Sequence, residues 1–586
     1  MLGRAHLLLP ASIALAAAAL AAPVAPAAAR ARLRLTVSPS RAVAGQPTHF
    51  RFRLIVVSRG TRRPAAGITV RFAGRRLRTD RRGRASVVLS LGSPGRYRAR
   101  SSKRRIGRAT ATVLVLPPSA HPGASPPVFA APFQIPGPGS FPLGASNGTE
   151  PRVAAAHAGA VYTAWSPDPG NAHAVLWRSS DGGRTFARAP GELPGQTTGT
   201  PDVDVVVTRT GRLILVEEDD PAGAALSLVT GYSDDGGATW TQSSGTTLVD
   251  QDRPFLAVGP DDPATHQPTV YLGYHNEFSA VGQQNMVVQV SRDGGASFGA
   301  PVPVTSPGQP AYLDLQCGAS FGPSSLSVNP ATGRIYLVFA TLSSALGGCG
   351  TLLGSQNEFI IPATRIWVAT SPDGSSGSWA QSLAVDDSTA GNIVALQFSP
   401  AALDRAGNVY LAYAESPRRY PDYDGAAVRL RRAPPDLSGW SRPLTVAPTG
   451  GAGNILPHVA AGDPGNVAVV YYEGVARTGH SPAWYLAVAQ LLGVDTAAPR
   501  TFHVRPSSIP AYTGTASELM GACSTVPGSG VTNAAQCTRS ADLFGIALRH
   551  DCRLVVSWPA INNDAAGSVQ ATLVSSQVAG ASLCSR

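Results

Sequence analysis

The octet Ser233-Asp234-Asp235-Gly236-Gly237-Ala238-Thr239-Trp240 decides the fold, because the same pattern occurs again elsewhere in the chain. Residues 179–186 and 291–298 repeat it, and a fourth copy with one extra residue ends at Trp379. Each copy places an Asp two positions after a Ser, where its carboxylate can accept hydrogen bonds from backbone N–H groups of its own turn. The glycines permit the positive φ angles of a tight reversal. The pattern therefore predicts hairpin turns in which four aspartates are structural: Asp181, Asp235, Asp293 and Asp373.

These octets resemble the Asp-box, or BNR, repeat of the sialidase superfamily, whose pattern is Ser-x-Asp-x-Gly-x-Thr-Trp. In that family the box is the hairpin between the third and fourth strands of a propeller blade. It lies on the face away from the active site. The resemblance therefore implies a propeller fold, and it assigns the boxes a structural role rather than a catalytic one.

The part of the chain from Glu150 onward repeats a polar turn followed by apolar strands. Seven segments fit the second strand of such a unit, namely residues 160–165, 212–216, 270–274, 333–339, 407–413, 466–472 and 553–558. Together with 62 Gly and 50 Pro in 586 residues, this pattern predicts an all-β fold. Seven units predict a seven-bladed β-propeller over residues 150–586. Six blades, as in sialidases, is the alternative if the last unit only closes the ring.

Residues 31–116 form a separate and very basic region, with 22 Lys and Arg residues against the single acid Asp80. Short β-rich runs between turns predict a small antiparallel β-sandwich. It is similar to bacterial immunoglobulin-like and carboxypeptidase-regulatory-like modules. Its arginine clusters favour attraction to an anionic wall polymer, lipid head groups or extracellular nucleic acid, without specific nucleic-acid recognition. A solvated surface without a ligand is the alternative.

The segments that flank this basic region have different compositions. Residues 1–29 are typical of a secretory signal peptide, with Arg4 and His6 before an apolar run and three alanines at positions 27–29. We therefore expect an exported monomer, secreted or at the cell surface, with no transmembrane segment in the mature chain. Residues 117–149 contain nine prolines and no charged side chain, and they predict an extended spacer.

The six cysteines are an even number in a chain expected to be exported, which predicts three disulfides. Fifteen connectivities are formally open. Local pairing would staple loops and close the ring through Cys317 with Cys349, Cys523 with Cys537, and Cys552 with Cys584.

The loops on the face opposite the boxes are where we expect function. They are the turns that lead into each unit and the loops between second and third strands. Their polar residues make an acidic mouth and are Glu150, Arg152, Asp202, Asp204, Asp250, Asp252, Arg253, Glu217, Glu218, Asp219, Asp220, His275, Asn276, Glu277, Glu415, Arg418, Arg419, Asn454, His458, Tyr472, Glu473 and Arg477.

The sialidase resemblance implies specific roles for some of these residues. Three arginines would clamp a substrate carboxylate, and by loop position they are Arg152, Arg253 and Arg418. Tyr472 would be the nucleophile, activated by Glu473 or by Glu277, because neighbours on a strand point to opposite faces. Asp202 or Asp252 would be the acid.

Two features depart from the sialidase pattern. The family signature Phe/Tyr-Arg-Ile-Pro is replaced by Phe133-Gln134-Ile135-Pro136, and an acidic mouth would repel an anionic sugar.

Two functions from different classes follow from these observations. One is a glycoside hydrolase of exo-sialidase type, acting on glycans. The other is a non-catalytic module that binds surface polysaccharide or protein partners and is held in place by the basic sandwich. We expect no cofactor and no metal, because the histidines lack paired metal-ligand spacing.

Overall fold

The computed structural model divides the chain into two compact units, Met1–Pro118 and Ser119–Arg586. It describes residues 31–38, 41–43, 47–58, 61–91, 95–104, 106–116, 125–135, 149–166, 174–196, 199–219, 226–246, 251–276, 284–317, 319–346, 363–388, 394, 398–417, 425–447, 451–496, 499–519, 544–562 and 569–584. The predicted signal peptide and Glu277, Arg418, Cys349, Cys523 and Cys537 lie outside these residues. Among the described helices, none is long and apolar enough to cross a membrane.

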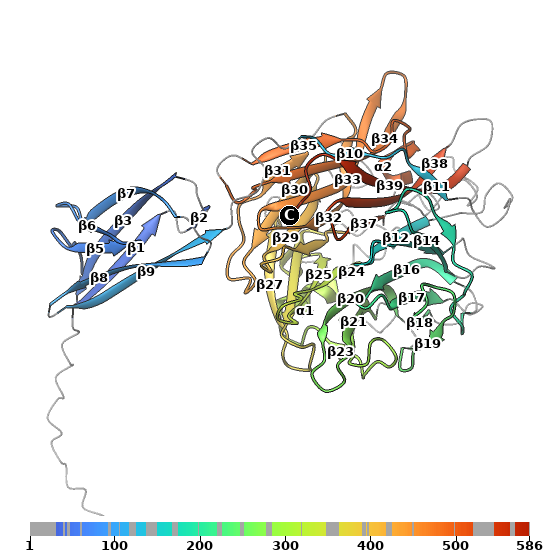
Figure 1. The fold of residues 1–586 in the computed structure, drawn as a ribbon, viewed down its shortest axis with the longest axis horizontal. Coiled ribbons are helices and arrows are strands. Elements are labelled where there is room, and N and C mark those ends of the chain that lie inside the picture. The colour runs from blue at the N-terminus through green and yellow to red at the C-terminus, as the bar shows by residue number, and fades with distance from the viewer. Residues whose placement is uncertain are drawn as a thin grey trace, which may run out of the picture. The chain divides into compact units, whose positions relative to one another are not determined.

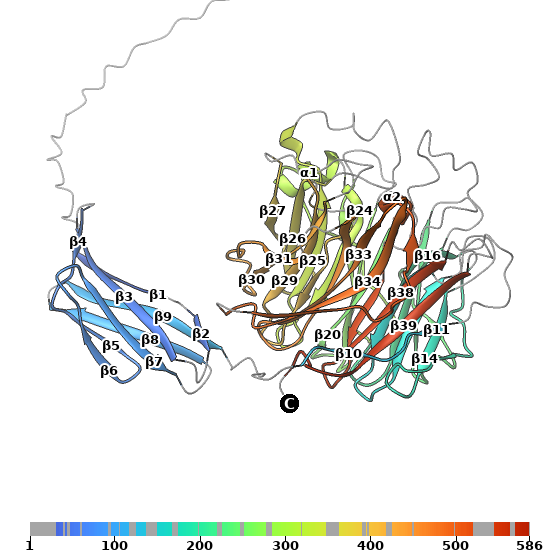
Figure 2. The ribbon, with the colours of Figure 1, turned by 90° about the horizontal axis from the view of Figure 1, so that it is seen from above.

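The first unit consists of two sheets that share one hydrophobic core (blue in Figure 1 and in Figure 2). Inward-facing residues alternate with exposed ones along the strands, as a half-buried sheet requires. The rings of Phe50 and Phe52 each lie against Phe72, with centroids 5.0 and 5.2 Å apart. In one sheet β3 (Pro47–Ser58) pairs with β1 (Arg32–Ser38), β4 (Thr61–Pro64) and β7 (Arg84–Ser90). The other sheet has the order β2 (Arg41–Val43), β9 (Gly107–Leu116), β8 (Gly95–Lys103), β5 (Thr69–Phe72), β6 (Arg75–Arg78).

The described part of the second unit forms seven antiparallel sheets. The first three are β12 (Thr149–Ala155), β13 (Val161–Ser166), β14 (Val175–Ser179), β15 (Ala187–Arg188); β16 (Gly199–Val207), β17 (Leu213–Asp219), β18 (Ser227–Ser233), β19 (Thr241–Gln242); and β20 (Asp252–Asp261), β21 (Pro268–His275), β22 (Met286–Ser291), β23 (Val302–Pro303). The all-β prediction is confirmed, since the described helices are limited to α1 (Pro310–Cys317), α2 (Ala516–Leu519) and the 3-10 turn Ser344–Leu346.

The next three sheets continue in chain order. They are β24 (Ala319–Val328), β25 (Ile335–Thr341), β26 (Arg365–Ser371), β27 (Ala380–Asp386); β28 (Ala401–Leu403), β29 (Val409–Glu415), β30 (Ala427–Ala433), β31 (Leu444–Ala447); and β32 (Gly453–Ala461), β33 (Asn466–Arg477), β34 (His480–Leu492), β35 (Arg500–Val504), with β36 (Tyr512–Thr513) also on β34.

The seventh sheet combines the two ends of the second unit. Strands β37 (Gly545–Leu548), β38 (Leu554–Asn562) and β39 (Val569–Ala579) pair in order, and β10 (Val128–Phe129) and β11 (Phe133–Ile135) both pair with β39. Residues 125–135, within the segment predicted as a spacer, belong to the second unit, and Phe133–Ile135 is one of its strands. The reason is apolar packing, because Phe133 and Ile135 join a hydrophobic cluster with Trp165 and Val574. The predicted disulfide between Cys552 and Cys584 is confirmed and ties the same sheet. Cys317 is also disulfide-bonded.

The seven sheets close into a ring. The first strands β12, β16, β20, β24, β28, β32 and β37 contact one another in succession, and β37 contacts β12. In Figure 1 the strands β16, β17, β18 and β19 follow one another in this order from the centre of this unit toward its edge. Seven hydrophobic clusters lie between successive sheets, the last of them joining the seventh sheet to the first. Burial of apolar surface between neighbouring sheets thus holds the ring together.

The octets form the hairpins between third and fourth strands of their sheets. In the one between β18 and β19, Asp235 accepts hydrogen bonds from the backbone N–H groups of Ala238 and Thr239, both at 2.9 Å, and from the Thr239 hydroxyl at 2.6 Å. These bonds lower the pKa of Asp235 to about 2. The Gly237 N–H donates to the Ser233 hydroxyl at 2.9 Å. Asp181 and Asp293 have the same arrangement, and Asp373 accepts the corresponding bonds from Ser375.

Candidate functional site

The candidate site lies at the end of the sheets opposite the Asp235 hairpin. In the second sheet Leu213 pairs with Ser233, next to the hairpin, whereas Glu218 pairs with Leu228 near the other end of β17. The first residues of the neighbouring strands β16 and β20 lie at this same end, because first and second strands are antiparallel. This end carries the loops that the sequence assigned to function.

The backbone here has a repeated irregularity. Strands β12, β16 and β20 each have a bulge near their first residues. Glu150 and Arg253 adopt positive φ angles of 48° and 58°, and each precedes a proline, Pro151 or Pro254. Such a conformation costs on the order of 1–3 kcal/mol per non-glycine residue, so surrounding contacts must enforce it. Bulges of this kind redirect side chains, and here they direct both toward the same cluster.

Arg253 is the centre of that cluster. Its Nη1 donates to Asp202 Oδ1 at 2.9 Å and to Glu150 Oε2 at 3.3 Å, and its Nε lies 3.6 Å from Asp252 Oδ1. Its backbone N–H donates to Glu218 Oε2 at 3.2 Å. One residue therefore contacts four carboxylates that come from three different sheets.

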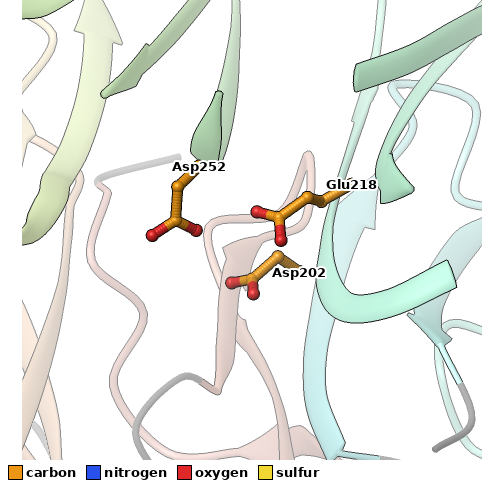
Figure 3. A group of neighbouring side chains, drawn as sticks. All are labelled: Asp202, Glu218 and Asp252. Carbon is orange, nitrogen blue, oxygen red and sulfur yellow. The ribbon is translucent and has the colours of Figure 1, made fainter. Parts of the chain in front are cut away.

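Three of these carboxylates point toward one another from β16, β17 and β20 (Figure 3). Asp202, Glu218 and Asp252 each place one oxygen within 4.8 Å of the others. Their residues are only 2–9% exposed. Four carboxylates around one guanidinium leave a net negative charge in a buried environment. Because a buried uncompensated charge is unfavourable, this charge favours protonation of a carboxylate.

Glu218 is the carboxyl group in this cluster whose pKa is raised. Burial raises the pKa of Glu218 well above its ordinary value, and the negative charges of Asp252 and Asp202 raise it further. The Arg253 guanidinium opposes this effect but does not cancel it. A hydrogen bond joins Glu218 to Asp252. Glu218 is thus the group in the site that keeps a proton at pH values where carboxyl groups are normally ionised.

His275 stands directly opposite Asp252 in the pairing of β20 with β21. Burial lowers the pKa of His275 to about 4, although the charge of Asp252 partly opposes the shift. The imidazole is therefore neutral at physiological pH and adds no positive charge to the site.

A second pair of charged residues lies beside the cluster. Arg152 donates from Nε to the Val203 carbonyl at 3.2 Å, and its guanidinium covers the ring of Phe255 at 4.4 Å. Asp204 accepts the backbone N–H of Leu256 at 2.8 Å. Burial raises the pKa of Asp204, with Arg152 opposing the shift.

The three clustered carboxylates could also hold a divalent cation. Calcium binds oxygens at about 2.3–2.6 Å, so two of its ligands can be up to about 5 Å apart, which fits this group. The expectation of no metal rested on histidine spacing alone, which gives no information about a group of three carboxylates from neighbouring strands. Arg253 already supplies positive charge at the same place.

Among the predicted site residues, the structure brings Asp202, Asp252 and Arg253 together and places Arg152 beside them. Two of the three arginines predicted for the clamp have partners within the protein: Nη1 of Arg253 donates to Asp202 and Glu150, and Arg152 donates from Nε to the Val203 carbonyl and covers Phe255.

The structure separates Tyr472 from Glu473, as strand alternation led us to expect. Tyr472 is fully buried in the hydrophobic cluster between the sixth and seventh sheets, 5.1 Å from the ring of Phe544. Glu473 points to the other face of β33, pairs with Arg505 at 2.8 Å and lines a different cavity of about 780 Å³. The cause is strand alternation, which separates neighbouring side chains.

Glu218, Glu150 and His275 are among the residues predicted at the acidic mouth, but the sialidase resemblance assigns them no role. A stronger signal in the sequence is a dipeptide that ends in proline. It lies at or near the start of six of the seven first strands. These dipeptides are Glu150-Pro151, Thr200-Pro201, Arg253-Pro254, Gly322-Pro323, Ser399-Pro400 and Leu456-Pro457. The residues on either side of these prolines include Glu150, Asp202 and Arg253.

No family model matches the chain, and no curated protein matches it. Solved structures similar to the chain include the α-L-arabinofuranosidase Arb93A from Fusarium graminearum with an iminosugar inhibitor, at 13% identity, covering 77% of this chain and 97% of that one, TM-score 0.39. A polysaccharide lyase described as an ulvan lyase matches at 11% identity, covering 76% and 97%, TM-score 0.45. The α-L-arabinanase of Penicillium chrysogenum with arabinobiose matches at 16% identity, covering 65% and 100%, TM-score 0.36. All three proteins are named for activity on glycans. At these identities and TM-scores, the roles of residues must come from the geometry of this chain.

Proposed function

We propose that this chain is a glycoside hydrolase whose chemistry is performed by Glu218 and Asp202, with Asp252 hydrogen-bonded to Glu218. The observation that carries the proposal is the convergence of these three carboxylates from neighbouring sheets on one place beside a single guanidinium. Glycosidic bond cleavage needs one carboxyl group that gives a proton and a second that is ionised. Groups whose surroundings separate their protonation behaviour can divide these two tasks.

Glu218 is the general acid in this proposal, because it keeps its proton. It would protonate the oxygen of the leaving sugar. Asp202 is the nucleophile, because Arg253 at 2.9 Å stabilises its negative charge. It would attack the anomeric carbon as the glycosidic bond breaks, and water would then release the sugar with Glu218 as base. The oxygens lie within 4.8 Å of one another, closer to the roughly 5–5.5 Å of retaining enzymes than to the wider inverting spacing.

The charge of the site favours a neutral glycan over a sialoside. Four carboxylates surround one guanidinium that is already paired, so a substrate carboxylate would meet repulsion. The proposal therefore keeps the glycoside hydrolysis implied by the sialidase resemblance, but its substrate is a neutral glycan in place of an anionic sialoside.

We also propose that the ring is a seven-bladed propeller and the first unit an immunoglobulin-like sandwich. Seven sheets joined by seven hydrophobic clusters support the first assignment, and two sheets around one core support the second. Export is supported by the leader-like residues 1–29 and by the Cys552–Cys584 disulfide, which is typical of an oxidising compartment.

The test is turnover of a panel of neutral polysaccharides (arabinan, galactan and xylan), polygalacturonate and a fluorogenic sialoside. Replacement Glu218→Gln should lower kcat by about 10²- to 10⁴-fold on the substrate that is cleaved. Activity of the wild type should fall as pH rises through the raised pKa of Glu218, because the acid must be protonated. Product stereochemistry by NMR should show retention.

The matched control is Glu415→Gln, at the last residue of a second strand in another sheet, where the carboxylate pairs with Arg429. It should leave kcat within about threefold. A wild type that cleaves none of the neutral glycans, or a Glu218→Gln variant with full activity, would contradict the proposal and leave a binding module.

A further inference from the structure

The outer face of the β2-β9-β8-β5-β6 sheet carries a set of exposed arginines. Residues on β8 alternate, so that Ala99 points into the core while its neighbours Arg98 and Arg100 point out. The same alternation on β5, β6 and β9 brings the remaining arginines to this face. We define the arginine face as Arg71, Arg76, Arg78, Arg96, Arg98, Arg100 and Arg108, all of which are exposed.

Three of these arginines stand in one row across neighbouring strands. Arg71 on β5 is directly opposite Arg76 on β6 and Arg100 on β8. Like charges in directly opposite positions destabilise a sheet, so this arrangement costs folding stability unless anions neutralise it. Strand spacing puts these positions about 5 Å apart, and arginines two residues apart along β8 are about 7 Å apart.

The unit has no side chain of its own that could neutralise the arginine face. Asp80 is the only acidic residue between positions 31 and 116. Its carboxylate accepts the backbone N–H groups of Arg82 and Arg84 in its own turn, both at 2.8 Å. Neutralisation must therefore come from outside the unit.

We propose that the arginine face binds a linear polyanionic polysaccharide that carries sulfate, phosphate or carboxylate groups. Guanidinium groups bind such oxyanions with paired hydrogen bonds. Exposed hydroxyls stand opposite arginines in the strand register, with Thr110 opposite Arg100 and Thr112 opposite Arg98. They offer partners for sugar hydroxyls between the charged positions.

Two other polyanionic surfaces fit the face less well. The four aromatic residues of the unit, Phe50, Phe52, Phe72 and Tyr97, all belong to its core or pack against it, so the face offers no ring for stacking of nucleic-acid bases. Val88, an exposed apolar side chain that could enter a membrane, lies on β7 in the other sheet.

The test measures binding of the full chain to dextran sulfate by fluorescence anisotropy over a range of salt concentrations, with uncharged dextran for comparison. The combined substitution Arg71→Gln, Arg98→Gln and Arg100→Gln should lower affinity at least 10-fold at low salt. It should also reduce the slope of log K against log salt by about three, because three ionic contacts are lost.

The control is Arg34→Gln, Arg51→Gln and Arg84→Gln, which removes the same charge from exposed positions on the other sheet. It should change affinity less than threefold. Thermal unfolding of both variants checks that they are folded. Polyphosphate and polygalacturonate distinguish phosphate and carboxylate polymers from sulfated ones.

Two results would overturn the proposal: equal losses in both triple variants, or tighter binding of duplex DNA or anionic vesicles than of any polysaccharide through the same arginines. Glu218→Gln should leave dextran sulfate binding unchanged, so the outcome is independent of the proposed hydrolase site.

Discussion

Glu150 and Arg253 lie on first strands that are two sheets apart in the ring, both have positive φ angles, and their side chains meet at 3.3 Å. Each residue is held in a strained backbone conformation, and the contact is made where the two strands begin. The interaction therefore links two bulges across the intervening sheet, whose Asp202 binds the same guanidinium nitrogen.

Replacement Arg253→Met should destabilise the protein by about 3–5 kcal/mol at pH 7, because it leaves Glu150, Asp202 and Asp252 buried without their positive partner. The loss should be smaller at pH 5, where these carboxylates take up protons more readily. Urea unfolding followed by tryptophan fluorescence measures both values.

The control for this experiment is Arg209→Gln, whose ion pair with Asp261 is largely exposed. It should cost less than about 1 kcal/mol. If Arg253→Met were as mild as Arg209→Gln, the guanidinium would not be the charge that stabilises the cluster.

Glu218→Gln should make the protein relatively more stable as pH rises. The folded-state pKa of Glu218 lies above its unfolded value, so as pH rises the unfolded chain ionises first, which lowers the free energy of the unfolded state. The unfolding free energy of the wild type therefore falls between the two pKa values and stays lower above them, whereas an amide at this position does not titrate. The difference in unfolding free energy between variant and wild type should therefore grow from pH 4 to neutrality. A difference that is flat with pH would argue against a buried, protonated Glu218, and Glu192→Gln controls for loss of an exposed carboxylate.

Tyr472→Phe should retain catalytic activity within about twofold. The hydroxyl belongs to a side chain packed against Phe544 in the hydrophobic core, and its removal should cost no more than about 1.5 kcal/mol of stability. Steady-state kinetics on the cleaved glycan measures the first value and urea unfolding the second. A loss of activity comparable to that of Glu218→Gln would restore the tyrosine nucleophile of the sialidase mechanism.

Ser233→Ala should destabilise the second unit by about 1–3 kcal/mol, because the buried N–H of Gly237 loses its acceptor. Asp235 would also lose one of the bonds that lower its pKa to about 2. Because that pKa is depressed, the stability from Asp235 is complete above the unfolded value near pH 4 and is lost as pH falls toward 2. Acid unfolding should therefore begin at higher pH in the variant. The exposed Ser244→Ala serves as control, and an equal effect there would remove the hairpin explanation.

Combined replacement Cys552→Ser and Cys584→Ser should lower the unfolding free energy by about 3–4 kcal/mol, as expected for a loop of 32 residues. Peptide mapping under non-reducing conditions verifies the bond in the wild type, and urea unfolding measures the difference. An unchanged midpoint would mean that pairing of β39 with β10 and β11 closes the ring without help from the disulfide.

The sequence was informative wherever the interactions are local. The hairpin around Asp235 depends on residues within four positions of it, so its turn chemistry could be predicted from the octet alone. Strand alternation and the repeat of apolar segments indicated the all-β fold for the same reason. Glu150 and Arg253 are far apart along the chain, and only the packing of successive first strands brings them together.

The role of Tyr472 could not be settled from sequence, because alternation gives two faces but not which face meets a neighbouring sheet. The sialidase resemblance implied a nucleophile at this position, whereas the structure packs the side chain in the core. The proline repeat in the first strands could be detected only by comparison of six units, and the bulges that accompany five of these prolines are visible only in three dimensions.

The pairing of β39 with β10 and β11 has a consequence for biosynthesis. A ribosome releases residues 128–135 more than 400 positions before it releases their partners, so throughout translation the nascent domain exposes an unpaired sheet edge and the apolar surface beneath it. A premature stop anywhere before β39 would leave that edge permanently open, and the truncated product should aggregate rather than accumulate as a smaller folded protein.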